Sequence, residues 1–112
     1  MMIKPFHLLL TACMSFLSPL GIAQTLHISE DFTEENLFTT NIEGPAFDSN
    51  GHLYVVNFEQ DGTVGVVNSN GQVERFITLP AGSTANSIQF DSKGFMYLAD
   101  FTGHNVLRVD MN

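Results

Sequence analysis

The sequence is short of basic residues, cysteine and tryptophan, and these shortages limit what the protein can bind. Its 112 residues contain one Cys, no Trp, and four Lys or Arg against twelve Asp or Glu. A formal net charge of −8 argues against nucleic acid and against an anionic membrane surface as partners. The acidic balance is compatible with cation binding or with a secreted enzyme, although solubility alone is its commonest cause.

The chain also lacks an apolar run long enough to span a bilayer, which takes about 20 residues. Its most apolar stretch, residues 6–17, follows Lys4 and is only about a dozen residues long. Small residues at the −3 and −1 positions then favour cleavage before Gln24. We therefore predict a signal peptide over residues 1–23 and an exported protein, periplasmic or extracellular, with no transmembrane span.

A bacterial lipoprotein is the alternative at this end of the chain. Residues 10–13, Leu-Thr-Ala-Cys, resemble a lipoprotein box that would make Cys13 a lipidated N-terminus. The apolar run before Cys13 is short and another follows it, so cleavage before Gln24 is favoured. The exported chain then has no cysteine, and its core, a metal or closure of a larger architecture must hold it together.

An internal repeat predicts the fold. Residues 47–58, Phe-Asp-Ser-Asn-Gly-His-Leu-Tyr-Val-Val-Asn-Phe, recur 43 positions later as Phe-Asp-Ser-Lys-Gly-Phe-Met-Tyr-Leu-Ala-Asp-Phe. Tight-turn residues separate short apolar runs, which is typical of an all-β chain, and a period near 40–50 residues is that of a propeller blade. We predict an N-terminal segment (24–41), a first blade (42–84) and a truncated second blade (85–112), about two blades of an incomplete ring.

Strands are expected in each repeat at the places where apolar and β-branched residues gather. They fall over residues 44–48, 52–58, 63–68 and 72–78 in the first unit, and over 87–91, 95–101 and 105–110 in the second. The second unit lacks a fourth strand, so we expect a fragment of a longer gene. Residues 37–40 are hypothesised to supply an outer strand to the last blade of the closed ring. Open blade faces predict marginal stability or self-association, because repeat units need neighbours.

The first repeat resembles the opening blade of the SMP-30/gluconolactonase/LRE-like family over about residues 42–110. The resemblance is carried by Glu43-Gly44-Pro45, followed by the Phe-Asp-x-x-Gly-x-Leu-Tyr-Val pattern of residues 47–55. The second pattern is also found in NHL-type propellers. The resemblance implies a six-bladed propeller that hydrolyses lactones or related esters with a divalent metal on its axis.

The same resemblance implies the candidate site. Glu43 matches a metal ligand, and Asn86 occupies the same place in the second unit, as a metal ligand, a substrate contact or simply a turn-capping residue. Oxygen ligands favour Ca²⁺, with Zn²⁺ and Mn²⁺ left open. The remaining ligands and the general base belong to later blades, so no catalytic residue is assigned and the fragment alone is expected to be inert.

Other polar residues point to structure rather than chemistry. Asn57 and Asp100 end matching strands and are expected to bond the following loops, while His52 and His104 have no second ligand nearby in the sequence. No nucleophile elbow and no phosphate-binding glycine loop is present. The alternative function is a non-enzymatic, NHL-like propeller that binds a protein, a glycan or a small molecule on its loops.

Overall fold

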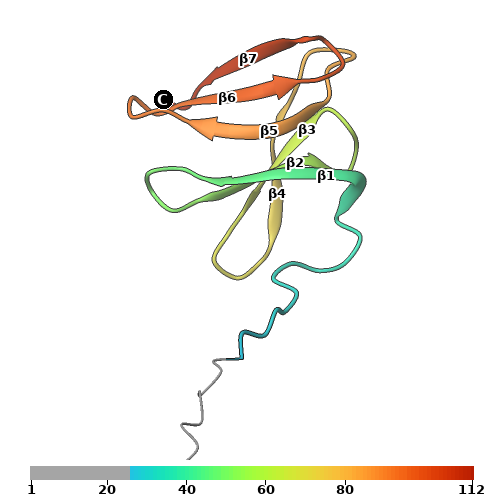
Figure 1. The fold of residues 1–112 in the computed structure, drawn as a ribbon, viewed down its shortest axis with the longest axis vertical. Helices are drawn as coiled ribbons and strands as arrows, with labels where there is room; N and C mark the ends of the chain where they lie inside the picture. The colour runs from blue at the N-terminus through green and yellow to red at the C-terminus, as the bar shows by residue number, and fades with distance from the viewer. Residues whose placement is uncertain (1–25) are drawn as a thin grey trace, which may run out of the picture.

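The computed structural model describes residues 26–112, so the predicted signal peptide (1–23), Cys13 and Gln24 lie outside the described residues. This part of the chain is all-β, with seven strands and no helix (Figure 1). The strands are β1 (Phe38–Phe47), β2 (Leu53–Phe58), β3 (Thr63–Val67), β4 (Val73–Thr78), β5 (Ala85–Phe90), β6 (Phe95–Asp100) and β7 (Asn105–Asp110).

The strands form two antiparallel sheets, each in the order of the sequence. The first sheet has four strands in the order β1-β2-β3-β4, and the second has three in the order β5-β6-β7. Such meanders need only tight turns between neighbours. The second sheet lies over the first, with β5 beside β1 and β2 (Figure 1).

The predicted strands agree with the observed ones except at β1. That strand begins at Phe38 rather than Gly44, and Phe38 pairs with Phe58 at the end of β2. The register of β1 shifts on both sides of Glu43, and such irregularities hide the two-residue alternation by which a strand is recognised. Residues 38–40 therefore extend β1, and a contribution of residues 37–40 to the last blade of a closed ring stays a prediction.

Three turns between strands share one hydrogen-bonding device. A side-chain oxygen of Asp48, Asn68 or Asp91 accepts the backbone N–H groups two and four residues later, at 2.8 to 3.1 Å. Each turn then has glycine at its fourth position with φ between 78° and 84°, where other residues are strained. The Asx-x-x-Gly spacing in the sequence is therefore the cause of the tight turns.

The core lies between the two sheets. It consists of strand side chains that point toward the facing sheet, together with Leu79 after β4: Tyr54, Val56, Val64, Leu79, Ala85, Ile88, Met96 and Leu98. Ile88, Met96 and Leu98 are essentially inaccessible to water. Burial of side chains of this size stabilises the fold by about 1.5–3 kcal/mol each, so the packing of one sheet on the other is the main source of stability.

Part of the opposite face of the first sheet is covered by residues 32–37 of the N-terminal segment (26–37), whose residues 26–31 are exposed. Val55, Phe58 and Val67 point away from the core cluster, yet all three are buried. Phe32 lines the space beside Val67, and the Leu37 carbonyl accepts the Glu59 N–H at 3.0 Å. The N-terminal segment thus occupies part of a face that an exposed sheet would otherwise present to water.

Candidate functional site

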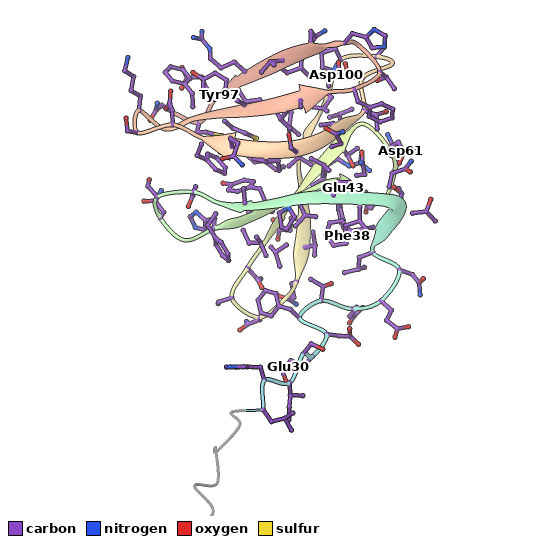
Figure 2. The ribbon with its side chains drawn as sticks, in the orientation of Figure 1. Glu30, Phe38, Glu43, Asp61, Tyr97 and Asp100 are labelled. Atoms are coloured by element: carbon purple, nitrogen blue, oxygen red, sulfur yellow. The ribbon has the colours of Figure 1, made fainter. Side chains whose placement is uncertain are left out.

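Glu43 lies on β1 where the strand is least regular. It pairs with Val56 of β2, between the two register shifts, and its side chain is exposed. Figure 2 shows Glu43 on the stretch of β1 that runs beneath the second sheet. The irregular backbone is a place where a side chain can be aimed away from the regular ladder.

Gly44 brings this part of β1 against the second sheet. Its φ is 46°, and a Cβ built on it would lie 2.5 Å from the Cα of Ser87 on β5. No side chain fits in that space, so the two backbones touch only because residue 44 is glycine. This contact explains why the Glu-Gly sequence matters physically: the glycine allows the approach that sets its neighbour beside β5.

Asn86 lies directly across this contact. It is the second residue of β5, exposed, and preceded by the fully buried Ala85. Glu43 and Asn86 line one small pocket of about 230 Å³, whose remaining walls are Thr40, Asn41, Asn57, Ala85 and Phe101. The two residues singled out from the sequence, 43 positions apart, therefore meet at one site.

Asn57 forms the buried floor of the pocket and ties the two sheets together. Its side-chain N–H₂ donates to the carbonyl oxygens of Asn41 on β1 at 2.7 Å and Ala85 on β5 at 3.1 Å. Its Oδ1 accepts the Gly62 N–H at 3.2 Å, which confirms the predicted bond to the following loop. The bridge between the sheets was not predicted, because nothing in the sequence places Ala85 beside Asn57.

Asp61 was missed by the sequence analysis. Its two carboxylate oxygens accept hydrogen bonds from Thr39 Oγ1 and Asn41 Nδ2, each at 2.7 Å, so it holds the irregular first half of β1 beside the pocket. Asp61 belongs to a turn that is one residue longer in the first unit than in the second, since the pairs Tyr54–Val66 and Tyr97–Arg108 are separated by 12 and 11 positions. That difference in length is the one signal by which the sequence marks it.

Asp100 is the counterpart of Asn57 in the second unit, and its partners are different. Its Oδ1 accepts N–H groups from Thr84 at 3.1 Å and Gly103 at 2.9 Å, which confirms the predicted bond to the next loop. The carboxylate is stabilised by hydrogen bonds, first from the Ser83 hydroxyl and the Gly103 N–H and then from Thr84 and Thr102. Together these bonds outweigh desolvation, which would raise the pKa. They lower the pKa of Asp100 to about 2. It is therefore a fixed anion that organises the β6–β7 turn.

The described residues fit part of the coordination shell of a hard cation. Glu43 offers a carboxylate and Asn86 an amide oxygen, whereas hydrogen bonds engage both ends of the Asn57 amide. Ca²⁺ takes about six to eight oxygen ligands, so two donors supply a minority of them. Over residues 26–112, no three His, Cys, Asp or Glu side chains come together as a metal site.

The histidines lie apart from this pocket. His52 Nδ1 is 3.0 Å from the Asp48 carboxylate, in a second hollow that is also lined by Tyr54, Phe76 and Phe90. Burial raises the pKa of Asp48, but hydrogen bonds from His52, chiefly that of its side chain, outweigh burial and lower the pKa overall. His104 has a φ of 53° in the turn before β7. Neither of these two histidines lines the Glu43–Asn86 pocket.

Comparison with known proteins adds no identification. No protein-family model and no curated protein matches the chain. In the part of the chain that the structure describes, no helix is long and apolar enough to cross a membrane. The class defined by fold and site is therefore an all-β protein of two packed antiparallel sheets with a polar pocket where β1 meets β5.

Proposed function

We propose that the two sheets are successive blades of a β-propeller of the SMP-30/gluconolactonase/LRE-like type. Both sheets are meanders in sequence order, and equivalent side chains face the same way around the stack. Tyr54 and Val56 face the second sheet, whereas Leu98, the counterpart of Val55, faces the first. Units related by one repeated rotation have this property, and stacking of such units is how propellers and other repeat folds are built.

Within that architecture, we propose that the Glu43–Asn86 pocket is part of the axial site of an exported, metal-dependent lactone hydrolase. The observation that supports this proposal most directly is the contact of Gly44 with the Ser87 backbone, beside which Glu43 and Asn86 line one pocket. First strands of neighbouring blades meet around a common axis, so donors at equivalent positions converge there. Inequivalent donors would be spread over the molecule.

Each side chain has a defined role in this proposal. Glu43 holds a divalent cation through its carboxylate, with Ca²⁺ preferred over Mn²⁺ and Zn²⁺ because its neighbours are oxygen donors. Asn86 holds the same cation through its amide oxygen or donates its N–H₂ to a lactone oxygen. A bound cation supplies Lewis-acid polarisation of the ester carbonyl. Asn57 keeps β1 and β5 at a fixed separation through its two donated hydrogen bonds.

Cation binding tests the role of Glu43. The protein, with its N-terminus and intact mass established by mass spectrometry, is titrated with CaCl₂, MnCl₂ and ZnCl₂ in a calorimeter. Glu43→Gln should weaken binding at least about tenfold, a loss of about 1.4 kcal/mol, since the amide removes the charge but keeps the shape. Glu74→Gln, an exposed carboxylate on β4, should leave binding unchanged. Equal affinities for wild type and Glu43→Gln would overturn the proposed ligand.

The same preparation tests the hydrolase assignment. If the natural exported product is longer than this sequence, lactone hydrolysis is measured on that product with and without a chelator. Activity that requires metal and falls with Glu43→Gln supports the proposal. Metal binding without hydrolysis of any lactone would reject the enzyme while retaining the site.

One observation favours the second candidate function, a non-enzymatic binding module of the NHL-like kind. Glu43 is the single carboxylate that lines the pocket in residues 26–112, and one carboxylate cannot serve at once as metal ligand and general base. A Glu43→Gln protein that retains both its metal content and its ligand binding would favour this module over the hydrolase.

A further inference from the structure

The second sheet has a face that nothing covers in the described structure. Phe95, Tyr97 and Ala99 alternate with the buried Met96 and Leu98 along β6, so they point away from the core. Their partners across the ladders complete the surface, which we call the open face: Gln89, Phe95, Tyr97, Ala99, Val106, Arg108 and, at the end of β7, Asp110. Val106 is 68% exposed, and Arg108 lies 4.7 Å over the Phe95 ring.

Five positions of the open face correspond to positions of the first sheet whose side chains pack in or against the core. In the first sheet the same ladder positions are held by Ala46, Tyr54, Val56, Val64 and Val66. These side chains belong to the core or pack against it, because the second sheet covers them. The open face therefore has the shape and strand geometry of a surface that receives another sheet.

Two of these positions have changed their chemistry. Ala46 and Val66 of the first sheet are replaced by Gln89 and Arg108 on the open face. A guanidinium buried under a purely apolar partner would cost several kcal/mol. A partner that covers this face therefore has to bring polar groups opposite Arg108 and Asp110, with an anion favoured at Arg108, beside an apolar surface for Tyr97, Ala99 and Val106.

The N-terminal segment carries that chemistry. It holds four acidic residues, Glu30, Asp31, Glu34 and Glu35, and its Phe32 is 56% exposed. Its residues 32–37 cover part of the side of the first sheet that corresponds to the core-facing side of the second. If the rotation that relates the first sheet to the second were applied once more, the first sheet of another molecule would lie over the open face. The acidic segment of that molecule would then lie between the two sheets.

We propose that the open face docks the N-terminal segment and first sheet of a second copy of this chain, head to tail. Arg108 meets the carboxylates of the incoming segment, and Tyr97, Ala99 and Val106 meet its apolar residues. Such a contact uses two different surfaces, so each bound copy presents a fresh open face, and association continues until a ring closes or a filament forms.

Sedimentation velocity on the protein expressed from its full sequence tests the docking, with the product's mass recorded. Wild type should form species larger than a dimer as concentration rises. Val106→Glu adds a like charge against the acidic segment and should weaken association at least tenfold. Val106→Thr, of similar shape and uncharged, should associate as the wild type does. A wild type that stays monomeric at the highest concentration overturns the proposal.

Mixing two variants tests the head-to-tail geometry. Val106→Glu disables the open face, and the double variant Glu34→Gln with Glu35→Gln weakens the segment, so each alone should associate poorly. Together they should form a dimer that does not grow, because one intact open face meets one intact segment. Absence of this dimer overturns the proposal, as does a longer natural product whose own further sheet covers the face.

Discussion

The two sheets are built from one repeated sequence, yet their surroundings differ. The first sheet is covered on one face by the second sheet and on part of the other by the N-terminal segment, whereas the second sheet is covered on one face only. Val64 on β3 is inaccessible to water, whereas Val106, which holds the equivalent ladder position on β7, is 68% exposed. Equivalent residues thus have unequal burial because stacked repeats obtain half their contacts from a neighbour.

The comparison is closest at Gly44 and Ser87, which occupy the same position in the two units and touch each other. Replacing Gly44 with the residue of the second unit, Gly44→Ser, should have the largest effect, because it disrupts the close contact between the two sheets. The new Cβ would overlap the Ser87 Cα, which lies 2.5 Å from its position, at a φ of 46°. We expect a loss of about 3 kcal/mol in the free energy of unfolding, from backbone strain and overpacking together.

Urea unfolding, followed by circular dichroism, measures this loss. The matched control is Ser87→Gly, which removes a side chain from the same contact and should cost no more than about 1 kcal/mol, the usual cost of glycine in a strand. Equal losses for the two variants would mean that the sheets do not approach each other closely at Gly44.

A second pair of equivalent residues, Asn57 and Asp100, sharpens the comparison. Asn57→Asp gives the first unit the side chain of the second and removes both amide donors that bridge Asn41 and Ala85. A buried carboxylate would then face two carbonyl oxygens. We expect a loss of about 2 kcal/mol at neutral pH, since unsatisfied buried groups cost about 1–3 kcal/mol each.

The loss should shrink in acid, where the new carboxyl becomes protonated and can donate one hydrogen bond. Unfolding at pH 7 and pH 4 measures this change, and Asn41→Ala, which keeps the backbone carbonyl, is the control for general damage to β1. An Asn57→Asp protein as stable as wild type would show that the bridge contributes nothing to the packing of the sheets.

Much of the strand pattern could be predicted because its causes are local. The Asx-x-x-Gly turns place their own glycines, and six strands were predicted nearly to their observed ends. The start of β1 could not be predicted, because it depends on Phe38 meeting Phe58 and on Asp61 holding Asn41, contacts about 20 residues apart. Propensity and periodicity do not report such pairings.

The candidate site likewise has features that could be predicted from the sequence and one that could not. The repeat offset alone places Glu43 and Asn86 at equivalent positions, and the structure brings both to one pocket. The bridge made by Asn57 depends instead on the angle between two sheets, which no local pattern encodes. Its Asp counterpart in the second unit makes a loop contact only, so even the repeat itself does not indicate a bridging role.

The smallest expected effect is a pH dependence of stability that arises from Asp100 in the second unit, because its counterpart Asn57 in the first unit does not titrate. Because hydrogen bonds in the folded state lower the pKa of Asp100 from 3.8 to about 2, its contribution to stability is complete above pH 3.8 and is lost as pH falls toward 2. Asp100→Asn keeps the shape of the side chain and cannot titrate. The difference in stability between wild type and Asp100→Asn should therefore narrow steadily between pH 5 and pH 2.5, about the window that the two pKa values define. Taking the difference also removes the shared contribution of Asp91, whose pKa is lowered chiefly by the Phe95 N–H. A difference that stays constant over this range would mean that the β6–β7 turn does not distinguish the charged from the neutral carboxyl.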